Sequence, residues 1–464
     1  MSKKRIAIAG GGIAGLAAAF YLAERLGDRA EIRLYEKERR LGGTIGTTRE
    51  EGYLVDWGPN GFLDREPLTL EFIDKIGLTA DLYRANDNSN KRFIFRKRRL
   101  REISANPVKF MTGGLLSIPG RLRILREYFV PPRGGDGDES VFDFAARRIG
   151  REAAEMLIDP MVSGIFGGDA RQLSLGACFP VMEKMERDYG GLIKALLARK
   201  KEKKGATQKG GPAGPSGHLT SFRGGLYTLV ERLEQHLRAV IETGNGLNRI
   251  KHNPDGTISL KLDDGERVCD YLILAVPSFI AGRILTETAP EASDLLQQIP
   301  YSNLAVVAQG YRREDISRPL DGFGFLVPHN QKRRILGSIW TSIIFPEQAP
   351  DGSALFRTML GGALDNQIVE ESRDHLAEIA HRELSDIMGI TGAPSFTRIF
   401  VWKKAIPQYV LGHRERLQRI YYLVNRLESI YLAGNAYTGI GLNETIKRSA
   451  SLAGDIIRHM DISS

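Results

Sequence analysis

The sequence has only two cysteines among its 464 residues, Cys178 and Cys269, and they lie in different segments. Two cysteines so placed imply no disulfide framework, which fits a reducing compartment. The eight histidines are scattered without the spacing of metal ligands, so no metal site is expected. The longest apolar runs, such as residues 271–282, are too short to span a bilayer, and the first strand begins too early for a signal peptide. These features predict a cytoplasmic protein.

The charge balance is mildly basic, since 65 Lys and Arg residues against 56 Asp and Glu residues leave a net charge of +9. An excess of this kind favours anionic partners. No segment has the pattern of a nucleic-acid-binding module. Anionic substrates or anionic lipid headgroups are therefore the expected partners, and nucleic acid is not. The length suffices for two or three domains with cores of their own.

The N-terminal segment RIAIAGGGIAG, residues 5–15, carries the strongest functional signal. An apolar strand at 6–9 enters a glycine-rich turn, and an alanine-rich helix is predicted at 13–25. The glycines of the motif are Gly10, Gly12 and Gly15. The first permits a tight turn, the second lets the backbone approach a pyrophosphate, and the third lets the helix pack closely on the strand. With free N–H groups at the helix start, the segment predicts dinucleotide binding.

A second apolar strand ends at Glu36, at the distance where an acid reaches the ribose hydroxyls of a dinucleotide. An acid there would repel a 2′-phosphate, so the cofactor is expected to be FAD or NAD rather than NADP. The next residues, EKERRLGGT, place Arg40, Gly42 and Gly43 just beyond the acid. This pair of glycines suits a second backbone approach to the pyrophosphate, with Arg40 as counter-charge. An ordinary Gly-Gly turn after a strand is the alternative interpretation of the same residues. The arrangement resembles the amine-oxidase-like superfamily of FAD enzymes.

The periodicity along the chain predicts an α/β fold with a discontinuous Rossmann-like FAD-binding domain. An antiparallel-sheet substrate domain and a helical domain are inserted into it. The expected boundaries are 1–85, 218–290 and 415–464 for the FAD-binding domain, 86–104 and 295–414 for the sheet domain, 105–200 for the helical domain, and 201–217 for a flexible linker. A strand is predicted at 267–276 and a helix at 368–388.

Several further segments, in the same order, resemble the family of protoporphyrinogen oxidase and coproporphyrinogen III oxidase over almost the whole chain. They are GYLVDWGPNGF (52–62), ESVFDFAARRIGREAAEMLIDPMVSGIFGGDARQLS (139–174), SFRGGLYTL (221–229), GFGFLVP (322–328), AIPQYVLGH (405–413) and LAGNAYTGIGLNETI (432–446). The resemblance implies an FAD enzyme of haem biosynthesis that oxidises a porphyrinogen in three two-electron steps. Dioxygen then reoxidises the flavin and is released as hydrogen peroxide. The protein's task is to orient the macrocycle and tune the flavin.

The resemblance also implies which residues form the site. The cofactor-binding set comprises Gly10, Gly11, Gly12, Ile13, Ala14, Gly15, Glu36, Lys37, Arg40, Gly42, Gly43, Gly58, Pro59, Asn60, Gly434, Asn435, Gly439, Ile440 and Gly441. The substrate set comprises Arg92 for a propionate, Phe323, Leu326 and Met359 as apolar walls, and Gly164 where backbone approaches the pyrroles. The family has an arginine where this chain has Asn60, so a second guanidinium contact is not carried over. The start of the last helix, at Gly439 and Gly441, is expected to stabilise reduced flavin through the helix dipole.

Several alternatives remain open at this level. Protoporphyrinogen is favoured over coproporphyrinogen by the 322–328 and 405–413 segments. A flavin amine oxidase is a second enzyme class, although no cysteine follows Cys269 to attach FAD covalently near the C-terminus. A flavin-bound porphyrin carrier is the non-enzyme alternative. Residues 115–130, LLSIPGRLRILREYFV, fit either a membrane-surface segment, with the protein peripheral on the inner face of the cell membrane, or an amphipathic core helix. A homodimer is a further expectation that the sequence leaves open.

Overall fold

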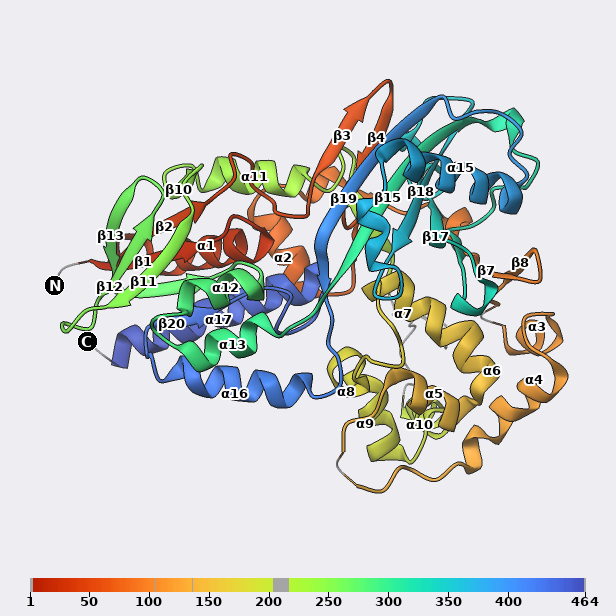
Figure 1. Cartoon of the computed structure of the whole chain (residues 1–464), viewed down its shortest axis with the longest axis horizontal. Coiled ribbons are helices and arrows are strands. Elements are labelled where there is room, and N and C mark those ends of the chain that lie inside the picture. The colour runs from red at the N-terminus through yellow and green to blue at the C-terminus, as the bar shows by residue number, and fades with distance from the viewer. Residues whose placement is uncertain (1–2, 105, 136, 203–216, 463–464) are drawn as a thin grey trace.

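The computed structural model describes residues 3–104, 106–135, 137–202 and 217–462. A five-stranded sheet forms the left half of the molecule in Figure 1. Its strands, in spatial order, are β10 (Ile241–Thr243), β2 (Ala30–Glu36), β1 (Lys4–Ala9), β14 (Tyr271–Leu274) and β20 (Ile430–Leu432). All four pairings are parallel. Segments from the start, middle and end of the chain therefore build one sheet, and the mixed α/β prediction is confirmed.

Helices cover both faces of this sheet. One face packs against α1 (Ile13–Leu26), α2 (Pro67–Lys75), α11 (Thr228–His236) and α17 (Leu442–Ile462), and the other against α12 (Ser278–Leu285), α13 (Pro290–Gln297) and α16 (His413–Asn425). Successive side chains of a strand point to opposite faces. Accordingly Ile6 and Ile8 of β1 enter the first core, whereas Ala7 and Ala9 enter the second.

A three-stranded antiparallel sheet extends from the left edge of the parallel sheet (Figure 1). It consists of β11 (Leu247–His252), β12 (Ile258–Leu262) and β13 (Gly265–Cys269). The single strand predicted at 267–276 is wrong, because the chain changes sheets at Asp270. The Asp270 carboxylate accepts hydrogen bonds from the backbone N–H of Arg5 at 2.7 Å and from its guanidinium. An apolar run alone did not reveal this break.

A seven-stranded sheet occupies the upper right of Figure 1. Its order is β19 (Phe396–Pro407), β15 (Tyr301–Arg312), β18 (Ser353–Gly361), β17 (Ile335–Trp340), β16 (Gly324–Leu326), β7 (Arg92–Arg96) and β8 (Arg99–Glu102). The sheet is antiparallel except that β16 and β7 run parallel. One face carries a core closed by α15 (Arg373–Met388), which begins later than the predicted helix at 368–388 because Ser372 caps its N-terminus.

Short elements join the two sheets. They are the hairpin β3 (Thr47–Glu50) and β4 (Tyr53–Asp56), the small sheet of β5 (Phe62–Leu63), β9 (Leu219–Phe222) and β6 (Leu82–Arg84), and α14 (Thr341–Ile344). Tyr53 of β4 stacks on Phe396 of β19 at 4.4 Å, so the hairpin packs directly against the large sheet.

The lower right of Figure 1 is helical. It contains α3 (Pro107–Thr112), α4 (Ile118–Leu125), α5 (Val141–Ile149), α6 (Arg151–Ala153), α7 (Asp159–Phe166), α8 (Leu175–Cys178), α9 (Pro180–Tyr189) and α10 (Leu192–Glu202). A fully buried ion pair, Arg148 with Glu127, fastens α5 to the turn after α4. Since α10 continues to Glu202, the first two residues of the predicted linker are helical, and 203–216 lie outside the described residues.

Across the residues that the structure describes, no helix is both long and apolar enough to cross a bilayer. The same residues contain no cluster of His, Cys, Asp or Glu suited to a metal ion. Cys178 and Cys269 are both free. Burial raises the pKa of each thiol to about 12.

Candidate functional site

The glycine-rich turn between β1 and α1 has the geometry that its motif predicts. Gly10 adopts φ +108°, and its N–H donates to the Tyr35 carbonyl of β2 at 2.8 Å. A Cβ on Gly15 would lie 2.0 Å from the Gly10 carbonyl oxygen, so only glycine permits α1 to pack this closely. Ile13 and Ala14 form the first turn of α1, which leaves their N–H groups facing the loop.

Glu36, at the end of β2, braces this turn. Its Oε2 accepts the Gly11 N–H at 2.6 Å, and its Oε1 accepts the Glu38 N–H at 2.8 Å. Each carboxylate oxygen keeps a further lone pair, so these contacts leave room for ribose hydroxyls as additional donors. Lys37 follows at the exposed rim.

The Arg40 guanidinium is bound to backbone carbonyls and does not project freely as a counter-charge to the pyrophosphate. It donates to the carbonyls of Leu41 at 2.9 Å, Ile45 at 2.7 Å and Gly43. It also lies 4.6 Å from the centre of the Trp57 ring. Arg40 therefore holds the Gly42–Gly43 turn in shape, and that turn meets the first loop where Gly42 donates its N–H to the Gly11 carbonyl at 2.8 Å.

The residues around these turns fit a bound dinucleotide. A Cβ on Gly12 or on Gly434 would meet nothing within 4 Å, so both glycines border open space. On the side toward the large sheet, buried polar atoms have no partner within the described chain: Asp56 Oδ2, Asn60 Nδ2, Arg357 Nε and Asn443 Oδ1. Buried polar groups are normally hydrogen-bonded, so these atoms indicate a polar ligand that completes the site.

The start of α17 forms the opposite wall. Gly439 has φ +65°, and the Glu444 side chain folds over the turn so closely that a Cβ on Gly439 or Gly441 would lie 2.6 or 2.4 Å from it. Asn435 accepts the hydroxyl of Tyr409 at its backbone carbonyl, and Ile440 packs against the helical core. The Glu444 carboxylate offsets part of the positive end of the helix that the sequence led us to expect as the stabiliser of reduced flavin.

Arg92, at the start of β7, is exposed at its surface, and partial desolvation of its guanidinium by neighbouring atoms lowers the pKa of Arg92. Its guanidinium carbon lies 5.2 Å from the centre of the Phe323 ring. Arg92 forms no ion pair with any residue that the structure describes, so its charge is available to an anionic ligand.

The remaining predicted substrate residues lie on one face of the large sheet or against it. Strand register places Leu326 opposite Gly337, and Gly337 opposite Met359. Gly164 of α7 abuts this row, since a Cβ there would lie 2.7 Å from Leu326 Cδ2. The side chains of Leu326 and Met359 stay half-buried although Thr358 and Leu360 beside them are buried. Leu326, Met359 and Gly164 therefore lie next to one another, and Arg92 lies in the same sheet, opposite Gly324 of the strand that carries Leu326.

Arg357, which the sequence did not single out, lies between the predicted cofactor residues and the predicted substrate residues. Arg357 of β18 is only 4% exposed and donates from Nη2 to the carbonyl of Gly58, next to Pro59 and Asn60. A strand-embedded arginine in an otherwise apolar run, LFRTML, is the signal that could have identified it.

His413, the first residue of α16, stacks on Tyr409 at 4.4 Å, and burial lowers the pKa of His413 to about 4. The stacked pair lies directly behind the Asn435 carbonyl that the Tyr409 hydroxyl contacts. The AIPQYVLGH segment therefore supports the flavin wall from behind and does not itself face the substrate residues described above.

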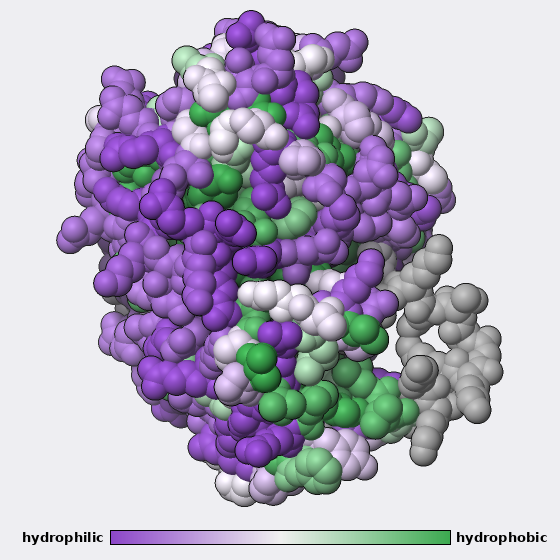
Figure 2. All heavy atoms as spheres, turned by 90° about the vertical axis from the view of Figure 1, so that its right-hand side faces the viewer, coloured by the Kyte–Doolittle hydropathy of each residue, from purple (hydrophilic) through white to green (hydrophobic). Residues whose placement is uncertain are grey.

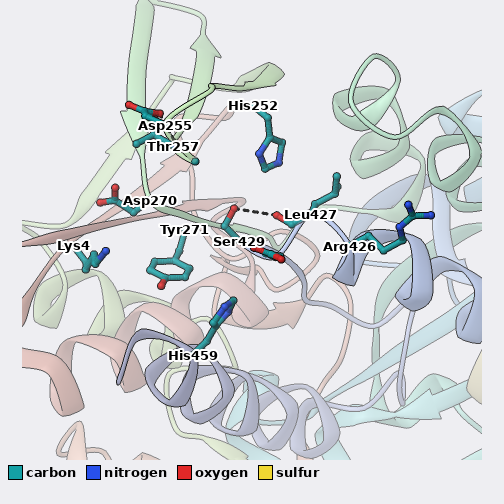
Figure 3. Close-up of a pocket in the computed structure, with 12 residues that line it drawn as sticks. Lys4, His252, Asp255, Thr257, Asp270, Tyr271, Arg426, Leu427, Ser429 and His459 are labelled. Atoms are coloured by element: carbon teal, nitrogen blue, oxygen red, sulfur yellow. Dashed lines mark hydrogen bonds between the residues drawn. The ribbon is translucent and has the colours of Figure 1, made fainter. Parts of the chain in front are cut away.

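A separate pocket of about 500 Å³ lies at the amino ends of the parallel strands (Figure 3). Lys4, Tyr271 and Ser429 line it from the starts of β1, β14 and β20. Open α/β sheets bind their ligands outside the carboxyl ends of the strands, where the glycine turns lie. This pocket is therefore not the dinucleotide site, despite its volume.

The parallel sheet, the glycine turn and the acid at the end of β2 define a dinucleotide-binding protein. The chain belongs to the family of flavin-containing amine oxidoreductases, whose model matches residues 13–457. The FAD prediction is thereby confirmed.

Comparisons with individual proteins show which members of this family the chain resembles. The chain is 29% identical to coproporphyrinogen III oxidase of Bacillus subtilis over 99% of both chains, and 30% identical to chloroplastic protoporphyrinogen oxidase of Oryza sativa over 97% of this chain and 87% of the relative. It also superposes on a crystal structure from Exiguobacterium sp. 255-15 named "Putative protoporphyrinogen oxidase" with a TM-score of 0.85 and 28% identity over 99% and 100% of the two chains. The family resemblance seen in the sequence is confirmed.

Proposed function

We propose that this protein oxidises a porphyrinogen to the corresponding porphyrin with bound FAD, and that dioxygen takes up the electrons and is released as hydrogen peroxide. Three molecules of dioxygen balance the six electrons and six protons that leave the macrocycle. The observation that carries the proposal is Arg92, which has no ion-pair partner among the described residues and lies in the same sheet as Leu326 and Met359. The relatives named for this activity support it over nearly the full length.

When bound, FAD supplies the two-electron acceptor. The chain's own residues orient the substrate. Arg92 binds a propionate, for which the planar guanidinium is suited. Leu326 and Met359 contact the faces of the macrocycle, and the lack of a side chain at Gly164 lets α7 pack closely against Leu326.

Turnover under air tests the proposal. Purified yellow protein should generate porphyrin fluorescence from a reduced porphyrinogen, together with one hydrogen peroxide for each two electrons. If porphyrinogen added without oxygen leaves the flavin absorbance unchanged, the protein is a carrier and not an oxidase. Benzylamine and putrescine, assayed in parallel for peroxide, test the amine-oxidase alternative.

We propose protoporphyrinogen IX as the substrate, on the strength of the 322–328 segment, which carries Phe323 and Leu326. Coproporphyrinogen III is the second candidate, because the Bacillus subtilis and Staphylococcus aureus relatives, which match 99% and 98% of this chain, are named for it. The two substrates differ by two vinyl groups against two propionates. The ratio of their kcat/KM values, measured on one preparation, decides between them.

The helical part supports a peripheral contact with a lipid surface. Val108, Ile118, Leu122, Leu125 and Phe129 are 53–80% exposed, and we call them the apolar helical surface. Figure 2, which views the molecule from the right-hand side of Figure 1, shows hydrophobic residues gathered in the lower half of that face. The segment 115–130 has features of both interpretations, because Leu115 and Leu116 are buried, the latter in the helical core, whereas in α4 only Gly120 is buried.

Vesicle co-sedimentation tests this contact. We expect binding to vesicles with anionic lipid, because exposed Lys109 and Arg126 flank the apolar helical surface. The paired substitution Leu125→Ser and Phe129→Ser should abolish it, whereas wild-type protein that stays in the supernatant would contradict it.

A further inference from the structure

We infer that Arg357 is the residue that raises the reduction potential of the bound flavin. The inference rests on flavin binding alone and needs no assumption about the substrate. Arg357 lies in an unusual place for a charged side chain. It is in the middle of β18, in the largest sheet, with 4% of its surface exposed.

The charge of Arg357 has no counter-charge in direct contact. Within the described residues its guanidinium makes one hydrogen bond, from Nη2 to the Gly58 carbonyl, while its Nε has no partner. Asp56 acts on it only through space, and no ion pair forms. The Asp56 carboxyl is itself held elsewhere, accepting the Thr47 hydroxyl at 2.6 Å and the Leu226 N–H at 2.9 Å. A buried cation without a partner is costly, so a ligand is expected to compensate it.

The position of Arg357 identifies which part of the cofactor it faces. A Cβ on Gly58 would lie 2.4 Å from the Thr44 carbonyl, and Thr44 follows Gly43, whose Cβ position lies 3.6 Å from Gly12 Cα. Gly58 therefore adjoins the pyrophosphate cradle. On its other side, Met359 is two residues along β18 and so shares the face of Arg357. Between the cradle and the substrate wall lies the place of the isoalloxazine ring.

The electrostatics of the opposite wall strengthen the inference. The start of α17 carries Glu444 folded over Gly439 and Gly441, which weakens the helix as a source of positive potential. Arg357 is then a buried positive charge held against the loop that adjoins the cradle, through its hydrogen bond to the Gly58 carbonyl. A fixed positive charge in a low-dielectric site favours the reduced, anionic ring over the neutral oxidised ring, and this difference is what a reduction potential measures.

The test is the midpoint potential of the holoprotein, measured against a reference dye without porphyrinogen. Arg357→Gln should lower the equilibrium constant for flavin reduction at least tenfold, which is about 30 mV for a two-electron couple. Arg357→Lys, which keeps the charge, should stay near the wild-type value. Arg398→Gln is the matched control, because Arg398 lies on the same face of the sheet but is half exposed and paired with Glu50.

Sulfite titration gives a second readout, since weaker stabilisation of negative charge on the ring should weaken sulfite binding in Arg357→Gln by a similar factor. An unchanged potential with weaker binding of oxidised FAD would overturn the inference, because Arg357 would then only hold the Gly58 loop. Loss of flavin from both Arg357→Gln and Arg357→Met, not reversed by added FAD, would overturn it for the same reason.

Discussion

Replacing Arg92 by alanine removes the guanidinium that we propose binds a propionate of the substrate. Arg92 approaches Phe323 but pairs with no carboxylate among the described residues, so the substitution breaks no ion pair of the folded protein. We therefore expect the variant to fold and to keep its FAD. Any loss of activity then reports on substrate binding.

The magnitude follows from the kind of contact and its exposure. A hydrogen bond between charged groups contributes about 1.5–3 kcal/mol, and the exposure of Arg92 favours the lower part of this range. At about 1.4 kcal/mol for each factor of ten, kcat/KM should fall by about ten- to thirtyfold. Arg92→Lys should recover part of this, because the charge returns without the bidentate geometry.

The neighbouring Lys91 supplies a matched control. It is also basic and exposed, but it pairs with Asp321 at the surface. Lys91→Ala should leave kcat/KM within about twofold of wild type. The two variants are compared by steady-state porphyrin fluorescence, which gives kcat/KM, with the flavin content of each preparation measured in parallel. The reasoning fails if Arg92→Ala retains wild-type kcat/KM, or if it loses flavin while Lys91→Ala does not.

Three further substitutions test the cofactor turn, the helical part and a buried histidine. Glu36→Gln should weaken FAD binding about tenfold in a fluorescence titration, because a neutral amide accepts the Gly11 N–H less strongly; unchanged affinity would contradict this role. Glu127→Leu leaves Arg148 buried with its main partner removed and should cost about 3 kcal/mol, seen as a lower urea midpoint, whereas an unshifted midpoint would mean that the pair adds nothing. The folded pKa of His413, about 4, lies below the free value of 6.5, so the unfolded chain binds the proton more readily and stability falls as the pH drops from about 6.5 toward 4. Between pH 7 and 5 the loss should be about 2 kcal/mol, and His413→Phe should remove that part of the pH dependence of the urea midpoint.

The cofactor half of the site was predictable because its chemistry is local. The contacts that require glycine in the first turn are made within a few positions in sequence, as between Gly15 and Gly10. Glu36, which accepts the Gly11 N–H, lies at the end of the next strand along the chain. The role of Arg40 could not be read in this way. Its partners are backbone carbonyls and the Trp57 ring, and which of these a flexible arginine contacts depends on the folded turn.

The proposed substrate residues could be named only through the family resemblance. Leu326, Gly337 and Met359 share a face because of strand register, and Gly164 reaches them from another part of the chain. No periodicity in the sequence relates residues 164 and 326. The change of sheets at Asp270 was missed for a related reason, since its partner Arg5 lies at the far end of the chain.

One strand carries a residue proposed to act on the cofactor and another proposed to contact the substrate. Arg357 and Met359 project from the same face of β18, the first toward Gly58 and the second beside Gly337. Between them Thr358 points to the opposite face, where its hydroxyl lies 3.1 Å from that of Ser338 on β17. Because both residues are buried, this contact fixes the register of the two strands and hence the spacing of the two functional side chains. A shift of the strand would therefore move Arg357 and Met359 together, so the proposed flavin contact and the proposed substrate contact share one structural constraint.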